Sequence, residues 1–445
     1  MTVPTLSQKQ RTELHLALLD YLNSQGLTRA FDALAEETQL GQAFVADGKQ
    51  RYSGLLEKKW TSVLRLNKKV SGLEEKLASI ESTLPSSKPI STLSQVPVTF
   101  LPTSTTPTLI LSGHRLAITS LAFHPLYNTI ATGAEDASIF LFDVDSYSDS
   151  SPGLSHAVKT LKGHTKGVNC VVFQEGFGSG SLLASASSDL SIKLWDTAHP
   201  STPCIRTLYG HNDSVSSIAF VPTAAIPGAQ ELLVSCSRDG TLKVWQVDTG
   251  LCLRTMDEVH SGEWVRMVAV SADGTMVASC SNDQTVAICD LSSGSILKRF
   301  MGHTHVVECV TFAPELAVKT IRNTVGGGSA SNKRTSEPPM GQYLVSGSRD
   351  KTIRIWDTVS GECVMILTGH ENWVRAITFH PSGTHLLSTG DDKTLRIWDL
   401  RTGGTLVQTL ERVQDQFVTC LGVHTRRGVF AVGGESAKVK VFKCA

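Results

Sequence analysis

The chain has 445 residues, 41% of them hydrophobic, a length that fits about three ordinary domains or one large repeat architecture. Lys plus Arg and Asp plus Glu both number 41, so the formal net charge is zero and the basic excess of a protein that binds nucleic acid mainly through charge is absent. The sequence contains no apolar run of about 18 residues, so we expect no membrane-spanning helix, and residues 1–11 do not resemble a secretory signal.

Residues 8–42 are predicted to form two short helices separated by a turn. In the first helix, apolar residues fall on one face, and Gly26 ends the pattern as a helix C-terminal glycine does. Two helices of about 15 residues cannot bury a core alone, so we expect them to dimerise or to dock on another surface. Their spacing resembles the LisH motif, a helical dimerisation module, although an unrelated amphipathic hairpin would show a similar pattern. The predicted dimerisation residues are Leu14, Leu18, Tyr21, Leu22, Gly26, Ala30 and Leu34.

Residues 50–84 are predicted to form a short coiled coil, because alternating steps of three and four positions give a mainly apolar stripe. The stripe consists of Leu56, Lys59, Val63, Leu66, Val70, Leu73, Leu77, Ile80 and Leu84. From Lys49 to Lys69 seven residues are basic and one is acidic, which favours a solvated helix flank over a site for a polyanionic partner. Residues 85–107 contain five Pro and many Ser and Thr, and we expect them to be an extended linker.

Residues 108–445 repeat a pattern that is about 40 to 50 residues long. A repeat begins near a Gly-His pair and ends in an aromatic residue followed by an acidic one. An Asp stands six positions before the aromatic residue, and a Ser or Thr stands four positions before that Asp. These features are typical of WD40 repeats, in which each repeat forms one four-stranded blade. The predicted fold is therefore mainly β: a seven-bladed β-propeller preceded by the helical segments.

The His, hydroxyl residue, Asp and Trp of a repeat are predicted to form one hydrogen-bonded set that holds the blade together. Two complete sets are His164, Ser185, Asp189 and Trp195, and His370, Ser388, Asp392 and Trp398. The same residue types occur in a Ser-His-Asp catalytic triad. A triad occurs once in a chain, however, whereas variants of this set recur six times, so we predict a structural role.

The seventh and the fifth repeats depart most from the pattern. The seventh lacks the His, and it has Ser436 in place of the Asp and Phe442 in place of the Trp. We expect residues 108–111, a short apolar strand before the first repeat, to pair with this blade and close the ring. In the fifth repeat about 30 residues separate Phe312 from Tyr343, and we expect this segment to be a flexible surface loop that is too polar to pack.

Large aromatic and basic residues recur at one rim of the predicted propeller. Two Arg residues directly precede the Asp of their repeats, and two Trp-Val-Arg triplets follow the His of theirs. Trp and Arg dominate interface hot spots, and Arg suits carboxylates on a partner. The alternative is that the Trp side chains pack between blades and the Arg side chains bond to the Asp of their own turns. The candidate partner-binding residues are Arg238, Trp264, Arg266, Arg349, Trp373 and Arg375.

Signatures of catalysis are absent from the sequence: it contains no GxxxxGK[ST], GxGxxG, HExxH or GxSxG motif. The ten Cys residues lack CxxC spacing, and Cys170, Cys236, Cys309 and Cys420 lie in apolar runs, so we expect buried thiols in a reducing compartment. We predict no enzyme activity, no cofactor, no metal site, no nucleic-acid partner and no insertion into a membrane.

The order of LisH motif, coiled coil, linker and WD40 repeats resembles the lissencephaly-1 family, called nuclear distribution proteins in fungi. The resemblance covers essentially the whole chain. Its most specific segments are YSGLLEKKWTSV (52–63), EWVRMV (263–268), ASCSNDQTV (278–286) and HVVEC (305–309). Departures are Cys289 in place of Trp, the length of the linker and the eroded seventh repeat, which puts in doubt any partner contact made through blade seven.

This resemblance implies a homodimeric regulator of cytoplasmic dynein in the cytoplasm and on the cytoskeleton, at microtubule plus ends and spindle poles. The propeller would bind the dynein heavy chain through the six candidate residues, with a NudE-like coiled-coil adaptor and only indirect contact with microtubules. Motor activation, plus-end targeting, nuclear migration and spindle positioning are the implied roles, and animal members also serve as the noncatalytic subunit of a platelet-activating-factor acetylhydrolase. The alternative is a LisH–WD40 nuclear scaffold of a transcriptional corepressor or general transcription complex.

Overall fold

A computed structural model describes residues 8–24 and 28–38 of the N-terminal part of the chain. In the C-terminal part it describes residues 101, 106–144, 157, 159–174, 182–197, 204–222, 230–325, 341–424 and 428–443. The predicted coiled coil at 50–84 and most of the predicted linker at 85–107 lie outside the described residues. The chain divides into two compact units, Met1–Lys88 and Pro89–Ala445. Among the described residues, no helix is both long enough and apolar enough to cross a membrane.

The N-terminal unit is a helical hairpin of α1 (Gln8–Ser24) and α2 (Thr28–Thr38), as the sequence predicts. The contact between the helices is made by Leu16 and Leu19, which are buried against Phe31, Leu34 and Ala35. Leu16 and Leu19 are not in the predicted dimerisation set, because they lie on the opposite face of α1. Helix α1 therefore has two apolar faces, of which the hairpin uses one.

The predicted dimerisation residues divide between these two faces. Leu34 belongs to the contact within the hairpin, whereas Leu18, Tyr21 and Leu22 are half-buried and Ala30 is exposed. Gly26 and the side chain of Leu14 lie outside the described residues. Leu18, Tyr21 and Leu22 form the second apolar face of α1, which we call the open face.

Strands β1 to β28 build the C-terminal unit, and their bounds follow in order along the chain. They are β1 (Leu109–Ser112), β2 (Ile118–Phe123), β3 (Thr129–Ala134), β4 (Ser138–Asp143), β5 (Lys159–Lys162), β6 (Val168–Phe173), β7 (Leu182–Ser187), β8 (Ser191–Asp196), β9 (Cys204–Tyr209), β10 (Val215–Phe220), β11 (Leu232–Ser237), β12 (Leu242–Gln246), β13 (Cys252–Met256) and β14 (Val265–Val270). The remainder are β15 (Met276–Ser281), β16 (Val286–Asp290), β17 (Ile296–Phe300), β18 (Val307–Phe312), β19 (Tyr343–Ser348), β20 (Thr352–Asp357), β21 (Cys363–Thr368), β22 (Val374–Phe379), β23 (His385–Gly390), β24 (Leu395–Asp399), β25 (Thr405–Leu410), β26 (Val418–Val423), β27 (Val429–Gly434) and β28 (Lys438–Lys443).

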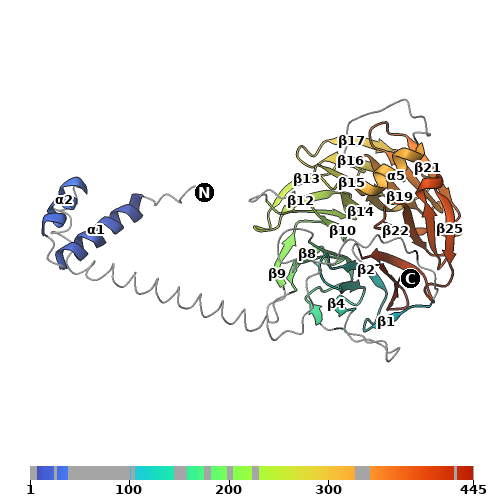
Figure 1. Cartoon of the computed structure of the whole chain (residues 1–445), viewed down its shortest axis with the longest axis horizontal. Helices are drawn as coiled ribbons and strands as arrows, with labels where there is room; N and C mark the ends of the chain where they lie inside the picture. Colours follow the sequence, from blue (N-terminus) through green and yellow to red (C-terminus); the bar gives the residue numbers. More distant parts are fainter. Residues whose placement is uncertain are drawn as a thin grey trace. The chain divides into compact units, whose positions relative to one another are not determined.

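Within the described part of the chain these strands form seven antiparallel four-stranded sheets, so the predicted seven-bladed propeller is confirmed. Blade one is β2 to β5, each following blade takes the next four strands, and blade seven combines β26 to β28 with β1. The first strand of each blade contacts the first strand of the next, and β26 contacts β2, which closes the ring (Figure 1). Every blade therefore exposes its loops between last and first strands, and its turns between second and third strands, at the same rim.

Ring closure uses the strand that the sequence predicts for it. Strand β1 pairs antiparallel with β28, and the register places Leu109 opposite Val441 and Leu111 opposite Val439. Leu111, Val439 and Val441 are buried in a shared apolar cluster with residues of blade one. The start and the end of the propeller are thus joined in one sheet. Leu101, inside the predicted linker, already packs against the core of blades six and seven.

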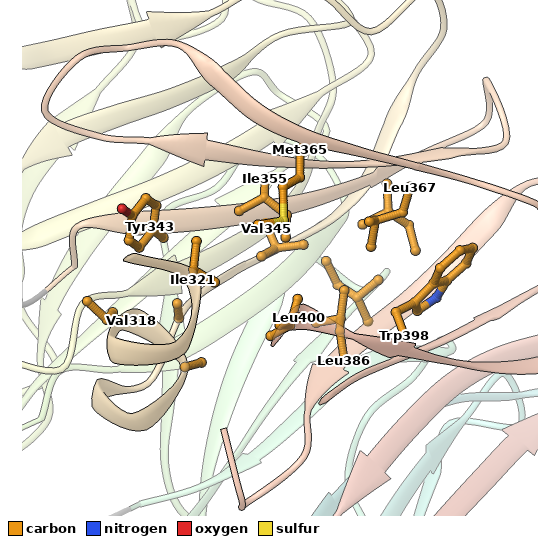
Figure 2. Close-up of a cluster of buried hydrophobic side chains, with 14 of the residues drawn as sticks. Val318, Ile321, Tyr343, Val345, Ile355, Met365, Leu367, Leu386, Trp398 and Leu400 are labelled. Carbon is orange, nitrogen blue, oxygen red and sulfur yellow. The ribbon is translucent and has the colours of Figure 1, made fainter. Parts of the chain in front are cut away.

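The prediction of a polar loop in blade five is wrong for the first part of the segment, which forms the helix α5 (Glu315–Val325). Ala317, Val318 and Ile321 recur at helical spacing and are buried. Figure 2 shows Val318 and Ile321 beside the core of blades five and six, and the cluster includes Leu400 of the short 3-10 helix η1 (Leu400–Thr402). The hydroxyl of Thr324 also donates to the Leu400 carbonyl over 2.9 Å. Helix α5 therefore braces blade five against blade six, at the rim opposite the loops described above.

Blade seven replaces the missing polar set with another one. Gln414 is fully buried, and its Nε2 donates to the carbonyls of Val432 (2.8 Å) and Lys438 (3.2 Å). The Ser436 hydroxyl donates to Gln414 Oε1 over 2.9 Å, so the amide is bonded at both ends. Phe442, in the Trp position, stacks on Phe430 with ring centroids 4.7 Å apart. Gln414 therefore takes the structural role of the His, and Ser436 takes the role of the Asp.

The substitution Gln414→Ala is expected to lower the free energy of unfolding by about 2–3 kcal/mol, because it leaves two carbonyls and the Ser436 hydroxyl without their partner in a buried place. The matched control is Gln416→Ala, which removes an exposed amide two residues away and should change stability by less than about 0.5 kcal/mol. Urea denaturation of both variants measures the difference. Equal stability of the two would contradict the role given to Gln414.

Candidate functional site

Each complete polar set forms a chain of hydrogen bonds from an indole to a carboxylate. In blade two, Trp195 Nε1 donates to Ser185 Oγ (2.8 Å), and this hydroxyl lies 2.7 Å from His164 Nε2. His164 Nδ1 lies 2.8 Å from Asp189 Oδ2, which also accepts from the backbone of Thr165. The only consistent assignment has the Ser hydroxyl donating to Nε2 and the Nδ1–H donating to the carboxylate. These hydrogen bonds link the loop before β6 to the turn between β7 and β8.

The same bonds recur around the ring. In blade six, His370 Nε2 lies 2.7 Å from Ser388 Oγ and Nδ1 lies 2.7 Å from Asp392, and Trp398 Nε1 donates to Ser388 over 2.8 Å. Complete sets also occur in blades three and five, and the His-hydroxyl-Asp part occurs in blades one and four. The predicted hydrogen-bonded sets are confirmed. Ser185 and Ser388 are fully buried, so neither can meet a substrate.

Burial and hydrogen bonding fix the charge states in the set of blade two. Burial lowers the pKa of His164, and the opposing effect of Asp189 does not restore it. Burial by itself raises the pKa of Asp189, but hydrogen bonds from Ser191, Thr165 and His164 outweigh it and lower the pKa to about 2. At neutral pH the set therefore consists of a neutral imidazole that donates to an ionised carboxylate. Burial likewise lowers the pKa of His114 in blade one.

The six candidate partner-binding residues meet at one rim as two stacks of Trp and Arg. In the first stack, Arg266 lies 3.6 Å and Arg238 lies 5.0 Å from the ring centroid of Trp264. Trp264 Nε1 donates to Ser216 Oγ of the preceding blade over 2.6 Å, and Arg266 Nε donates to Asn282 Oδ1 over 2.7 Å. Trp264 thus connects two blades and stays half-exposed, so part of the inter-blade packing alternative is also realised.

The second stack is built around Trp373. Arg349 lies 4.1 Å and Arg375 lies 4.8 Å from its ring centroid. Arg349 Nε donates to Glu308 Oε1 over 2.5 Å, and Arg375 contacts Glu308 at 3.6 Å and Asp391 at 2.8 Å. Arg349 is therefore not bonded to the Asp of its own turn, because Asp350 pairs with His303. The carboxylates align the guanidinium groups against the ring.

The two stacks form one charged patch, which we call the Arg–Trp face. Arg266, Glu308 and Arg375 are the second residues of β14, β18 and β22, and these strands are neighbours in the ring. Burial lowers the pKa of Arg266, while Glu308 opposes this effect and Arg349 adds to it. The four Arg residues thus lie among the carboxylates of Glu308 and Asp391 and the exposed Asp213, and Glu435 of blade seven also acts on Arg375. Stacked, half-exposed guanidinium groups suit the carboxylates of a partner.

Sequence reasoning missed the carboxylates Glu308 and Asp391 and a third aromatic residue at this rim. Phe417 stands directly before the first strand of blade seven, as Trp264 and Trp373 do in blades four and six. Aligning the buried Val that follows each of these residues would have revealed it. Among the described residues, no group of three or more His, Cys, Asp and Glu side chains could hold a metal ion. Cys236, Cys309 and Cys420 are buried in blade strands, and Cys170 is half-buried.

Comparisons with known proteins agree with this architecture. Residues 8–43 match the PAC1 LisH domain model, and the WD domain (G-beta repeat) model matches 105–143, 155–196, 202–246, 250–290, 336–357 and 361–399. The chain is 39% identical over 425 residues to nuclear distribution protein PAC1 of Arthroderma otae, an alignment that covers 94% of this chain and 88% of that relative. It is 37% identical over 417 residues to nuclear distribution protein nudF of Aspergillus niger, with the same coverage. PAC1 of Gibberella zeae is 41% identical over 427 residues, again covering 94% of this chain and 88% of the relative.

The polar sets predict that stability falls as the pH falls. Unfolded His residues take up a proton near their ordinary pKa of 6.5, whereas folded His114 and His164, with lowered pKa values, do not. The free energy of unfolding should therefore decrease below about pH 6.5, and decrease again below about pH 4, where unfolded Asp residues protonate before Asp189 does.

Urea denaturation at about pH 7 and about pH 5 tests the first step. His164→Ala removes one of these imidazoles and should make the free energy of unfolding less dependent on acid than in the native chain. Stability that rises between pH 7 and pH 5 would contradict neutral, buried imidazoles.

Proposed function

This chain belongs to the family of nuclear distribution proteins, and we propose that it is a non-catalytic, dimeric regulator of cytoplasmic dynein. The observation that carries the proposal is the Arg–Trp face, a rigid group of aromatic and cationic side chains on one rim of a closed propeller. The sequence similarity to proteins named for nuclear distribution supports a role in nuclear migration along the dynein pathway. It favours this function over a nuclear transcriptional scaffold.

The partner of the Arg–Trp face is the motor domain of the dynein heavy chain. Arg349 is 17% and Arg375 is 26% exposed, so each guanidinium is held against Trp373 and Glu308 yet keeps an edge toward solvent. Such a side chain loses little conformational entropy when a carboxylate binds, and this favours affinity. Arg238 is 57% exposed and only 3.9 Å from Asp213, so it adds a looser cation at the border of the face.

Dimerisation through the open face of α1 would give the regulator two propellers. Leu18, Tyr21 and Leu22 are apolar and remain half-exposed in the hairpin, and the match of residues 8–43 to a LisH model supports self-association. Two joined propellers raise each other's effective concentration on one motor or on a motor pair. The predicted coiled coil at 50–84 would extend this dimer.

In the cell, the proposed regulator works in the cytoplasm and on the cytoskeleton, at microtubule plus ends and spindle poles. It promotes active motor complexes and supports plus-end targeting, nuclear migration and spindle positioning. A NudE-like coiled-coil protein is the proposed adaptor, and microtubules are reached indirectly through the motor.

The substitutions Arg349→Ala and Trp373→Ala are each expected to raise the Kd for a purified dynein motor domain at least about tenfold, because these two half-buried side chains form the centre of the second stack. Lys319→Ala is the charge-matched control, since Lys319 lies on α5 at the opposite rim and its contact with Glu315 is exposed. Binding measured with immobilised motor domain decides the matter. Native affinity in both face variants would exclude the Arg–Trp face as the motor-binding site.

The double substitution Leu18→Asp with Leu22→Asp is expected to give a monomer, because two carboxylates on the open face would lose their hydration in a dimer. Light scattering should show half the native mass, and the apparent affinity for the motor should fall about 10- to 100-fold through loss of avidity. Asn23→Asp with Ser24→Asp adds the same charges at exposed positions of α1 and should remain dimeric. A monomer that binds the motor as tightly as the native chain would exclude avidity as the mechanism.

A further inference from the structure

We propose that Phe417, together with Lys393, is a third aromatic–cation contact that extends the Arg–Trp face onto blade seven and receives an apolar side chain of the same partner. This inference rests on the proposed function of that face and adds to it a recognition element on blade seven. It reverses the expectation from sequence that the eroded blade makes partner contact doubtful.

The backbone holds Phe417 in the same place as the two Trp residues of the face. The Phe417 carbonyl accepts a hydrogen bond from the Glu435 amide over 3.1 Å. The Trp264 carbonyl accepts from Asn282 (3.0 Å) and the Trp373 carbonyl accepts from Asp391 (2.9 Å) in the same way. Each bond joins the residue before the first strand to the turn between the second and third strands of its own blade. The three aromatic side chains therefore leave the same rim from equivalent positions.

A cation from the preceding blade accompanies each of these rings. Arg238 of blade three approaches Trp264, Arg349 of blade five approaches Trp373, and Lys393 of blade six lies 6.0 Å from the ring centroid of Phe417. Lys393 Nζ also donates to the Asp415 carbonyl over 3.1 Å, which holds the ammonium beside the ring. Blade seven thus repeats the aromatic–cation arrangement although it lost the His, Asp and Trp of its polar set.

The side chain of Phe417 differs from that of Trp264 in its hydrogen bonding, and it is exposed to solvent. Trp264 uses its indole N–H to bond to the neighbouring blade, whereas a phenyl ring has no such group. Phe417 is 40% exposed, unlike Phe430 and Phe442 of the same blade, which are buried and stacked on each other. A large apolar side chain on a fixed backbone, open to water at the edge of a cationic face, has the properties of an interface anchor.

The chemistry around Phe417 defines what it would receive. The Asp415 carboxylate lies 3.4 Å from Lys440, and Glu435 acts electrostatically on Arg375, so blade seven adds little net charge to the face. The matching partner surface therefore presents carboxylates to the Arg–Trp stacks and an apolar side chain to Phe417. Trp373 stands directly before β22 and Phe417 directly before β26, and these two strands are neighbours in the ring. One amphipathic helix of the motor can therefore contact both side chains.

The test compares full-length variants for binding to the dynein motor domain. Phe417→Ala is expected to raise the Kd about 5- to 20-fold at an unchanged melting temperature, and Phe417→Trp, which copies the other two rings, to keep native affinity. Leu406→Ala is the matched control: it removes an equally exposed apolar side chain (41%) from β25 and should bind as the native chain does. Lys393→Glu leaves the Phe417 side chain in place and should also weaken binding. It provides the test if Phe417→Ala lowers the melting temperature.

Trp373→Ala separates the two levels of the proposal. Weaker binding by Trp373→Ala with native affinity in both Phe417→Ala and Lys393→Glu would overturn the inference and leave the Arg–Trp face intact. Native affinity in all three variants would overturn the proposed function itself.

Discussion

The propeller depends on one contact that recurs in six of its blades, a buried imidazole hydrogen-bonded to the carboxylate of an Asp. In blades one to six this contact joins a loop and a turn that are between 22 and 47 residues apart in sequence. In blade two, Asp189 accepts from His164, from the backbone of Thr165 and from the hydroxyl of Ser191. The Ser hydroxyl and the indole extend the chain into the blade. Because every donor has an acceptor, the buried polar groups stabilise the rim where the Arg–Trp face is built.

The ring tolerates failure of this contact in single blades because the failure is compensated locally. Blade four has Cys289 in the Trp position but keeps the bond between Ser279 and His260 and the bond between His260 and Asp283. Blade seven lacks the His and the Asp of the polar set, and there Gln414 bonds to the backbone and to Ser436 while β1 adds a fourth strand. The part of the ring with the poorest repeat sequence is thus the part held by pairing of the two ends of the propeller.

The sequence predicts the features that are periodic and misses those that occur once. The polar sets, the blade count and the closing strand follow from repeated spacing, and so do the Arg and Trp positions of the face. Gln414 was missed because an amide can replace an imidazole only where backbone carbonyls happen to point at it. Leu16 and Leu19 were missed because α1 is apolar on two faces, and a single stripe cannot show which face packs within the chain. Helix α5 was missed because its three buried residues lie in a segment that is otherwise mostly polar.

The brace made by α5 has a mechanical meaning. Blades five and six carry the second stack on one rim, and the same two blades are joined by α5 on the other. Separating blades five and six would expose Ala317, Val318 and Ile321 to water in addition to the facing sheets. The lost burial costs free energy, so α5 opposes separation of the two blades. A force that acts on the rim of blades five and six would therefore meet a pair of blades that are joined on both sides of the ring.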